Sequence, residues 1–259
     1  MSTALALLYH DPDGRLIPQI ERTLSLLTGI FDGIAICASA VANPPALDLW
    51  RDQGALIIKD APSDSPPYLR LGEARRQAVT LALKHDTSHV LYCDGDRVLH
   101  WAEHHPDELR QIAATIQDYD FTVLGRTLRA FASHPGVQRD TEGIVNNVFE
   151  RTTGWKWDVG SGSRGLSRRA IEAINDHCPD EAISVDVTWP LCLRNLDNYS
   201  LGYVTVEGLE FETGDGYDHQ QATTDEYQDW LDELDNDPQR WAFRLKLSQL
   251  HIEKLIEYL

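Results

Sequence analysis

The stretch HVLYCDGDRV, residues 89–98, decides the fold of this chain. The apolar run from His89 to Cys93 predicts a buried β-strand, which ends abruptly in Asp94-Gly95-Asp96. Continuous apolar strands are typical of parallel sheets that helices cover on both faces. Because ligands bind beyond the carboxyl edge of such sheets, both aspartates are expected where the fold places its chemistry.

The residues before this stretch alternate between apolar runs and helical periodicity. Strands are predicted at 4–9, 34–38 and 55–58, and helices at 17–31, 47–50 and 71–81. This alternation predicts an α/β fold with a mostly parallel central sheet flanked by helices. The loops that hold His10, Ser39 and Asp60 follow the first three strands, so they should face the same crevice as the two aspartates.

The second half of the chain has a weaker pattern. Helices are predicted over 106–116 and 167–174, and strands over 121–124 and 203–206; residues 126–131 continue the former strand or start another. A long helix is predicted over 239–259. Its apolar stripe indicates packing against the domain or against another subunit, and it consists of Trp241, Leu245, Ile252, Leu255 and Leu259.

Composition excludes several classes of function. The chain has 259 residues, is 42% hydrophobic and carries a net charge of −18, which argues against nonspecific binding to nucleic acid or to an anionic membrane. A local arginine cluster could still bind a small anion. The four cysteines are scattered without a CxxC pair, so neither a zinc site nor a disulfide scaffold is expected. With no signal peptide pattern and no membrane span, we expect a soluble cytoplasmic protein.

Asp94 and Asp96 can converge on one hard cation. Oxygen ligands suit Mg²⁺ or Mn²⁺, and such ions commonly bind substrate phosphates as well. Gly95 would let the backbone turn tightly between the two carboxylates. The alternative is an ordinary surface turn, because Asp and Gly are common turn residues.

The order of motifs resembles the GT-A glycosyltransferases. After strand, helix, strand and strand come LGEARRQAV (71–79), HVLYCDGD (89–96), GSGSRGLSRRAIEAI (160–174) and ISVDVTWPLCL (183–193). The resemblance extends from about residue 4 to residue 219. It implies one GT-A-like domain over 1–259, with a nucleotide-binding half (1–100), an acceptor-binding half (101–238) and a C-terminal helix (239–259).

The resemblance also implies roles for individual residues. Asp94 and Asp96 match the DxD motif that holds a divalent cation against the donor diphosphate, and His219 matches a late histidine that some members use as a further metal ligand. Asp186 matches the acidic catalytic position. The implied nucleotide-sugar-binding residues are Tyr9, His10, Ser39, Asp60, Arg70, Arg75 and Asp94. Departures from the family pattern are Tyr9-His10-Asp11 after the first strand, Ser39 in place of a frequent aspartate and Arg76 in place of a frequent asparagine.

Each of these residues also has a structural interpretation. Arg70, Arg75 and Arg76 would help to neutralise a diphosphate, or they are solvated surface arginines. Asp186 would take the proton of an acceptor hydroxyl if the enzyme inverts, with Asp180 and Glu181 as substitutes, or it caps a helix.

The acceptor side is predicted from residue types alone. Trp155, Trp157, Ser163 and Arg164 would form an acceptor wall, since aromatic faces stack on sugars, or the tryptophans belong to the core. Arg126, Arg129 and Arg168 would recognise an acidic acceptor.

The resemblance therefore implies a metal-dependent glycosyltransferase that uses Mn²⁺ or Mg²⁺ and a UDP- or GDP-type nucleotide sugar. The acceptor would be a small molecule or a glycan, and the C-terminal helix could form a homo-oligomer. Three alternatives remain. Asp94 to Val98 also fits the DxDx[TV] motif of haloacid-dehalogenase-like phosphatases, although three strands precede it. A nucleotidylyltransferase would need a Gly-rich basic loop where this chain has HDPDGR. A degenerate GT-A-like scaffold would act as a binding module.

Overall fold

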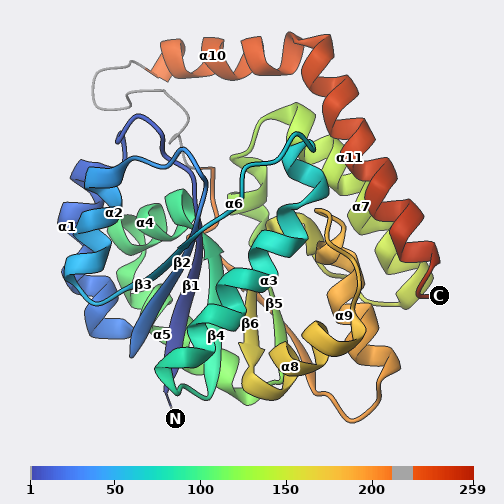
Figure 1. Ribbon diagram of the computed structural model, residues 1–259. Helices are drawn as coiled ribbons and strands as arrows, with labels where there is room; N and C mark the ends of the chain where they lie inside the picture. The colour runs from blue at the N-terminus through green and yellow to red at the C-terminus, as the bar shows by residue number, and fades with distance from the viewer. Residues whose placement is uncertain (1, 212–223) are drawn as a thin grey trace.

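The central element is a seven-stranded sheet with the strand order β3-β2-β1-β4-β6-β5-β7, in a computed structural model that describes residues 2–211 and 224–259 (Figure 1). The strands are β1 (Thr3–Tyr9), β2 (Gly33–Ala38), β3 (Leu56–Lys59), β4 (His89–Asp94), β5 (Phe121–Arg126), β6 (Ser163–Ser167) and β7 (Leu201–Val206). All pairings are parallel except those of β6 with β4 and β5. The predicted α/β fold with a mostly parallel sheet is confirmed.

The reversed direction of β6 matters for the site. Tyr92 of β4 lies opposite Arg164 of β6, so β6 begins at the edge where its neighbours end. On the other side of β4, Asp94 lies beside Leu8 of β1. The loop before β6 therefore joins the loops after the parallel strands at one carboxyl edge.

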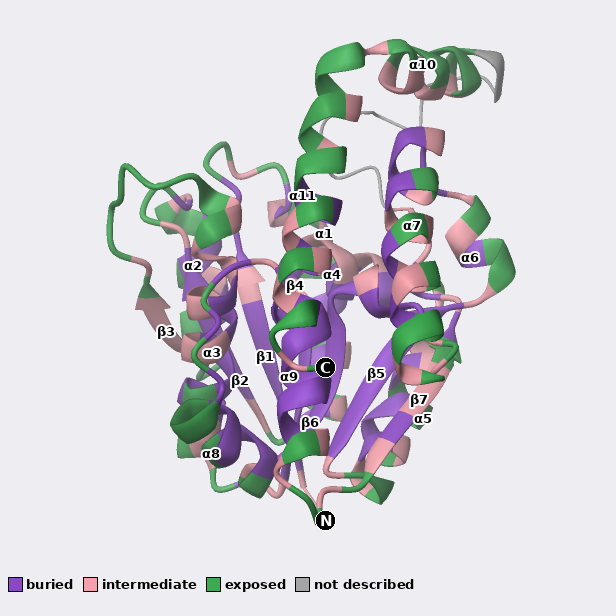
Figure 2. Ribbon diagram, turned by 90° about the vertical axis from the view of Figure 1, so that its right-hand side faces the viewer, coloured by how far each residue is buried: buried purple, intermediate pink, exposed green. Residues whose placement is uncertain are grey.

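Two layers of helices cover the sheet, because successive strand residues point to opposite faces. In β1, Leu5, Leu7 and Tyr9 face one layer, whereas Ala4 and Ala6 face the other. Most residues of the central strands are buried between the two helix layers (Figure 2). The first layer comprises α1 (Ile17–Ile30), α2 (Pro44–Asp52), α4 (Gly95–His104) and α5 (Pro106–Thr115); the second comprises α3 (Leu71–Ala82), α8 (Arg168–His177) and α9 (Val185–Asn195).

A further group of helices comes from the second half of the chain. It consists of α6 (Leu128–Ala132), α7 (Gly136–Thr153), α10 (Thr224–Asn236) and α11 (Pro238–Ile256), and short 3₁₀ turns lie at Pro67–Leu69, Leu83–His85, Ile116–Asp118 and Val159–Ser161. α11 runs along α7 and packs on α9 (Figure 1). Its buried positions are Leu247, Ser248, His251 and Leu255.

The predicted packing of the C-terminal helix against the domain is therefore confirmed, but the predicted stripe is partly wrong. Leu255 is buried, whereas Leu245 and Leu259 are exposed. The face that packs on α7 includes two polar residues, Ser248 and His251, which an apolar stripe cannot reveal. Ser248 donates a hydrogen bond to the carbonyl of Thr141 on α7 (2.9 Å).

Other elements differ from the sequence predictions. β5 ends at Arg126, and Thr127 caps α6 by accepting a hydrogen bond from the backbone N–H of Ala130 (3.1 Å), so residues 126–131 are not a second strand. The sequence analysis did not predict α7, β6 or the helix α4 that begins directly at Gly95. The other predicted elements are present, with shifted ends.

One disulfide joins Cys178, at the end of α8, to Cys192 in α9, whereas Cys37 and Cys93 are buried and free. The sequence analysis expected no disulfide scaffold and did not foresee this single bond. Within residues 2–211 and 224–259, no helix has the length and apolarity that a bilayer crossing requires.

We predict that this disulfide contributes measurably to stability. It closes a loop with a sequence separation of 14 residues, and constraining the unfolded chain in this way is worth about 3 kcal/mol. Thiol reductant should therefore lower the free energy of unfolding in urea by about 2–3 kcal/mol. The double variant Cys178→Ser/Cys192→Ser should already have the lower value and should not respond to reductant. An identical denaturation curve for the wild-type protein with and without reductant would contradict the prediction.

Candidate functional site

Asp94 is the last residue of β4, and one of its carboxylate oxygens is held in place from behind. Tyr92 lies two residues earlier on the same face of the strand, and its hydroxyl donates to Asp94 Oδ1 (2.7 Å). Arg75 of α3 donates from Nε to the Tyr92 hydroxyl oxygen (3.1 Å). Asp94 is partly exposed, whereas Tyr92 and Arg75 are buried. This chain of hydrogen bonds fixes the orientation of the carboxylate.

Gly162 lies close to the second oxygen of the Asp94 carboxylate. Its φ of +77° is in the left-handed region, and a Cβ there would lie 3.2 Å from Arg75 Nη2 and 3.8 Å from Asp94 Oδ2. The second carboxylate oxygen and the Arg75 guanidinium thus both lie beside the backbone of Gly162. Arg97, directly after the DGD motif, donates to the carbonyl of Ser161 (3.0 Å) and joins the same loop to α4.

The DGD motif itself is a strand end followed by a helix start. Gly95 is the first residue of α4, and Asp96 lies in its first turn. A Cβ on Gly95 would meet the carbonyl oxygen of Leu8 at 2.9 Å and Tyr9 Cδ2 at 3.0 Å. Gly95 is therefore needed because β1 passes close by, and the expected tight turn is wrong.

Asp96 faces a second region of the edge. It lines a cavity of about 220 Å³ together with the loop that follows β1; the other lining residues are His10, Asp11, Pro12, Asp13, Arg15 and Leu16. We call this space the Asp96 cavity. Three of its lining residues are aspartates and one is an arginine, so its charge favours a cation.

The ends of β1 to β3 bring the predicted polar residues together in pairs. His10 Nδ1 lies 2.9 Å from Ser39 Oγ, and Arg70 pairs with Asp60 (3.0 Å). Tyr9 is different: it is 1% exposed, and its hydroxyl donates to Asp11, whose carboxylate also accepts from the backbone N–H of Leu16 just before α1. The predicted contact between Tyr9 and a nucleotide does not fit this burial.

Asp186 lies in the first turn of α9, and its carboxylate is enclosed by cationic and polar groups. It is 4% exposed. Arg75 Nη1 lies 2.6 Å from its Oδ1, Arg164 Nη2 lies 3.1 Å from the same oxygen, and His251 Nε2 lies 3.6 Å from its Oδ2. Burial alone would raise the pKa of Asp186, but Arg75, His251 and Arg164 outweigh burial and hold the pKa below its usual range.

This environment does not suit the general base that the sequence analysis expected. A general base must be reachable by the acceptor hydroxyl and works best with a pKa near the working pH, whereas the Asp186 carboxylate is buried and its pKa is held below the usual range. The substitutes do not form an equivalent site. Asp180 is buried and accepts hydrogen bonds from the Ala182 backbone and the Thr188 hydroxyl, while Glu181 is exposed.

The predicted acceptor wall is also largely internal. Ser163 donates its hydroxyl proton to the Tyr92 carbonyl (2.8 Å), and Arg164 is 2% exposed. Trp155 and Trp157 are half-buried and stack on each other with ring centroids 4.4 Å apart, packed against Phe149. Both tryptophans therefore pack on the edge of a buried apolar cluster and stay partly exposed.

Three other arginines have partners of their own. Arg76 donates to backbone carbonyls of Ile174, Cys178 and Asp180 at the end of α8. Arg168 donates to carbonyls of Leu83 and Thr87, at the opposite edge of the sheet from Asp94. Arg129 pairs with Glu207 and Glu210. The expectation that Arg129 and Arg168 bind an acidic acceptor is therefore not supported.

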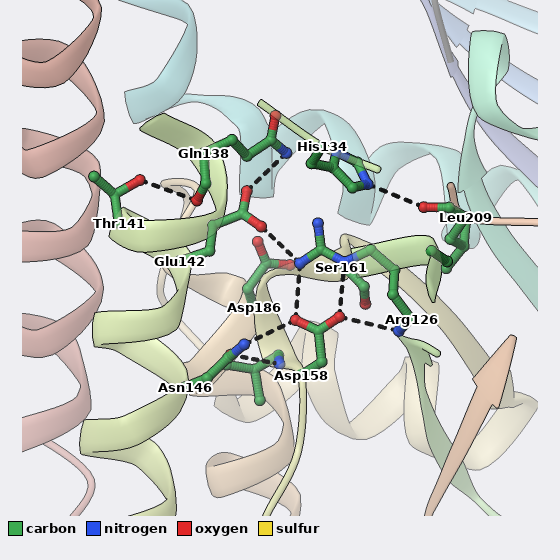
Figure 3. A network of polar contacts seen from close by, with 12 residues as sticks. Arg126, His134, Gln138, Thr141, Glu142, Asn146, Asp158, Ser161, Asp186 and Leu209 are labelled. Carbon is green, nitrogen blue, oxygen red and sulfur yellow. Dashed lines mark hydrogen bonds and ion pairs between the residues drawn. The ribbon is translucent and has the colours of Figure 1, made fainter. Parts of the chain in front are cut away.

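Arg126 belongs to a buried polar network beside α7 (Figure 3). Its Nε and Nη2 donate to both carboxylate oxygens of Asp158 (2.7 and 2.8 Å), and Nη2 also donates to Glu142 (2.6 Å). Asn146 donates to Asp158 from the other side (2.9 Å). The third guanidinium nitrogen, Nη1, is buried without a hydrogen-bond partner.

The donor set at the DGD motif fits a hard divalent cation. Asp94 and Asp96 supply carboxylate oxygens, and Mg²⁺ is usually held by one or two carboxylates together with waters and substrate phosphates. Among the described residues, no three His, Cys, Asp or Glu side chains are arranged to hold a metal ion by themselves. His219, the third predicted ligand, lies outside the described residues.

The sequence analysis missed Tyr92 as a partner of Asp94. The signal was available, because residues two apart on a strand share a face. The positions of Gly162 and Arg97 had no comparable signal, since both depend on a loop that lies more than 60 residues from the DGD motif.

Comparison with known proteins identifies the fold. No protein-family model matches this sequence, and no curated protein sequence does. Glucosyl-3-phosphoglycerate synthase from Mycobacterium tuberculosis with Mn²⁺, UDP-glucose and phosphoglyceric acid superposes with a TM-score of 0.59 at 14% identity, covering 99% of this chain and 79% of that chain. The same protein with Mn²⁺, UDP-glucose and glycerol 3-phosphate gives a TM-score of 0.57 at 14% identity, with coverage of 99% and 79%. The chain has the GT-A fold found in those glycosyltransferase structures.

We predict that Asp186 is required mainly for stability. Asp186→Asn leaves Arg75 and Arg164 buried without a counter-charge, so the free energy of unfolding at pH 7 should fall by about 3–5 kcal/mol. Because the pKa of Asp186 is lowered in the folded state, this contribution is fully present above the unfolded value of about 3.9. It is lost as the pH falls through the folded pKa, so wild type and variant should converge in acid.

The matched control is Asp176→Asn, which changes an exposed aspartate at the end of α8. It should stay within about 0.5 kcal/mol of wild type in urea denaturation. Equal stability of Asp186→Asn and Asp176→Asn at pH 7 would show that the buried charge is not needed.

Proposed function

We propose that this protein is a metal-dependent glycosyltransferase that moves a sugar from a nucleotide-diphosphate sugar to an acceptor hydroxyl. The observation that carries the proposal is the Arg75–Tyr92–Asp94 chain of hydrogen bonds at the carboxyl edge of a GT-A sheet. It supports a carboxylate that is oriented in advance, next to a buried guanidinium. Among the solved structures that share the fold, some contain Mn²⁺ with UDP or UDP-glucose.

The donor is proposed to lie over the ends of β1 to β4. Asp94 and Asp96 would hold Mg²⁺ or Mn²⁺, and His219 would be a further ligand. The ion would neutralise the diphosphate leaving group. His10, Ser39, Asp60 and Arg70 are proposed to bind the base and ribose of a UDP- or GDP-type donor.

We propose a positioning role for Asp186 instead of a proton-accepting one. It holds Nη1 of Arg75, while Nη2 of the same guanidinium lies beside Gly162 and Asp94. Arg75 is buried to the same extent as Asp186, so its proposed role is indirect: it holds the Tyr92 hydroxyl, and this hydroxyl orients the Asp94 carboxylate.

The phosphatase alternative has no supporting observation. In haloacid-dehalogenase-like enzymes the nucleophilic aspartate ends the first strand of the core, whereas Asp94 ends the fourth strand of this chain. A binding module remains the opposing hypothesis, and it is distinguished by measuring transfer as well as binding.

We predict that UDP- or GDP-glucose raises the melting temperature only when Mn²⁺ or Mg²⁺ is present. Asp94→Asn should abolish this metal-dependent shift, because it removes a charged ligand of the cation, whereas Asp176→Asn should retain it. Release of UDP or GDP in the presence of an acceptor would then separate an enzyme from a binding module. A shift of equal size with and without metal would contradict the proposed role of the DGD motif.

We also predict that Tyr92→Phe weakens Mn²⁺ binding by about tenfold, because groups that orient a metal ligand typically change affinity 10–100-fold. The variant keeps the ring and loses only the hydroxyl between Arg75 and Asp94. Isothermal titration with Mn²⁺ in the presence of UDP measures the effect. Tyr199→Phe, which changes a tyrosine outside the site, is the control. Unchanged Mn²⁺ affinity in Tyr92→Phe would refute the orienting role.

A further inference from the structure

A second cavity, of about 250 Å³, lies between α7, α10 and α11. Its lining combines apolar and polar side chains, and the residues are Pro135, Val137, Gln138, Phe211, Trp230, Leu234, Arg240, Phe243 and Arg244. We call it the α7–α11 pocket. Asp235 joins α10 to the start of α7, because its carboxylate accepts hydrogen bonds from the backbone N–H groups of Gly136 and Val137 (both 2.8 Å).

The described residues that line this pocket carry positive charge, although the whole chain is acidic. The protein has 41 acidic and 23 basic residues, yet the lining within residues 2–211 and 224–259 contains two arginines and no carboxylate. The Asp96 cavity, in contrast, is lined by three aspartates. A lining with two guanidinium groups among aromatic side chains suits a small acid with an apolar portion.

Arg244 is only partly neutralised within the protein. It donates to Glu142 (3.2 Å) and to the neutral amide oxygen of Gln138 (3.0 Å). Glu142 is shared, because it also accepts the shorter hydrogen bond from Arg126 (2.6 Å). Burial lowers the pKa of Arg244, Glu142 counteracts this effect, and Arg97, Arg126 and Arg240 lower the pKa again. An anion beside Arg244 would relieve this repulsion.

Buried, unpaired polar atoms lie behind the pocket. Arg126 is 4% exposed, and its Nη1 has no hydrogen-bond partner. Figure 3 shows this nitrogen pointing away from Asp158, toward the side where Gln138 and His134 lie. His134 Nδ1 is also buried without a partner, and its ring packs on Phe211 of the pocket lining (5.3 Å between centroids). Arg126 does not itself line the pocket, so its positive charge would act on a bound anion only through space.

The pocket lies at the same end of the molecule as the DGD motif. Arg97 directly follows Asp96 and acts electrostatically on Arg244 and on His134. In Figures 1 and 2, α10 lies at the end of the molecule toward which the parallel strands run, and Figure 2 shows it above α7. The pocket is therefore placed for a molecule that approaches the proposed donor site from the acceptor half.

We infer that the acceptor is a small acid and that the α7–α11 pocket binds it. Its carboxylate or phosphate pairs with Arg244, and its apolar part lies against Phe211 and Phe243. That the bound acid is a sugar acceptor rests on the proposed glycosyl transfer. The binding of the acid itself depends neither on a donor nor on a metal ion.

The test measures binding to the full-length protein without nucleotide or divalent cation, by isothermal titration at constant ionic strength. Glycerol 3-phosphate and benzoate are the acidic probes, and glycerol and benzyl alcohol are their neutral counterparts. Each acid should bind at least tenfold more tightly than its neutral counterpart. The acid that binds with the higher affinity shows whether the pocket prefers a phosphate or a carboxylate. Equal binding of acids and neutral counterparts would overturn the inference.

Three variants locate the binding. Arg244→Gln should weaken both acids at least tenfold, since it removes a charge-assisted contact. Arg151→Gln, which changes an exposed arginine of α7 outside the pocket, should bind like wild type. Phe243→Ala changes a residue that is 47% exposed, so the fold should tolerate it, and it should weaken benzoate more than glycerol 3-phosphate. Wild-type affinity for both acids in Arg244→Gln would refute the site.

Acid binding and sugar transfer can fail separately. If UDP- and GDP-sugars do not bind but the acids bind through Arg244, the proposed glycosyl transfer fails and the pocket stands. If the protein transfers sugar from a nucleotide donor but the acids do not bind, the proposed function stands and this inference fails.

Discussion

The buried charge of Asp186 is the constraint on which the rest of the site depends. It joins α9 to Arg75 of α3, to Arg164 of β6 and to His251 of α11, so elements from both halves of the chain converge on one carboxylate. A buried ion pair adds little to stability compared with apolar packing, but breaking it leaves an uncompensated charge. The arrangement therefore holds Arg75 in one position, and Arg75 in turn holds Tyr92 against Asp94. Stability of the fold and geometry at the carboxyl edge are thus linked through the same guanidinium.

The first half of the fold could be predicted because burial on both faces of a parallel sheet leaves continuous apolar runs. β1, β2 and β4 are such runs, and their helices have the expected periodicity. β6 could not be predicted in this way. Its sequence, SRGLS, contains a buried arginine, for which Asp186, 22 residues away, provides the counter-charge and the carbonyls of Val159 and Ser163 accept hydrogen bonds. α7 was missed for a related reason, since its buried positions include Gln138 and Thr141, whose polar atoms are satisfied within the folded protein.

The candidate site was predictable to the extent that position along the sheet determines it. Asp94, His10, Ser39 and Asp60 lie at the carboxyl edge because the strands before them are parallel and adjacent. The burial of Tyr9 was not predictable from that rule, because its hydroxyl is taken up by Asp11 in the following loop. Asp186 was assigned from its resemblance to a catalytic position, but its partner Arg75 is 111 residues away in sequence. Pairings at such distances decide whether an acidic residue is a base or a counter-ion.

The acidity of the chain restricts where an anionic ligand can bind. A protein with a net charge of −18 repels a nucleotide sugar and an acidic acceptor over most of its surface. Such ligands can bind only where a cation or a group of arginines reverses the local sign. At the DGD motif a divalent ion held by Asp94 and Asp96 would achieve this, and in the α7–α11 pocket Arg240 and Arg244 would do so. Because surface charges are screened within about 8–10 Å at physiological salt, each reversal acts locally. The distribution of charge would then direct two anionic substrates to two separate places along one edge of the sheet.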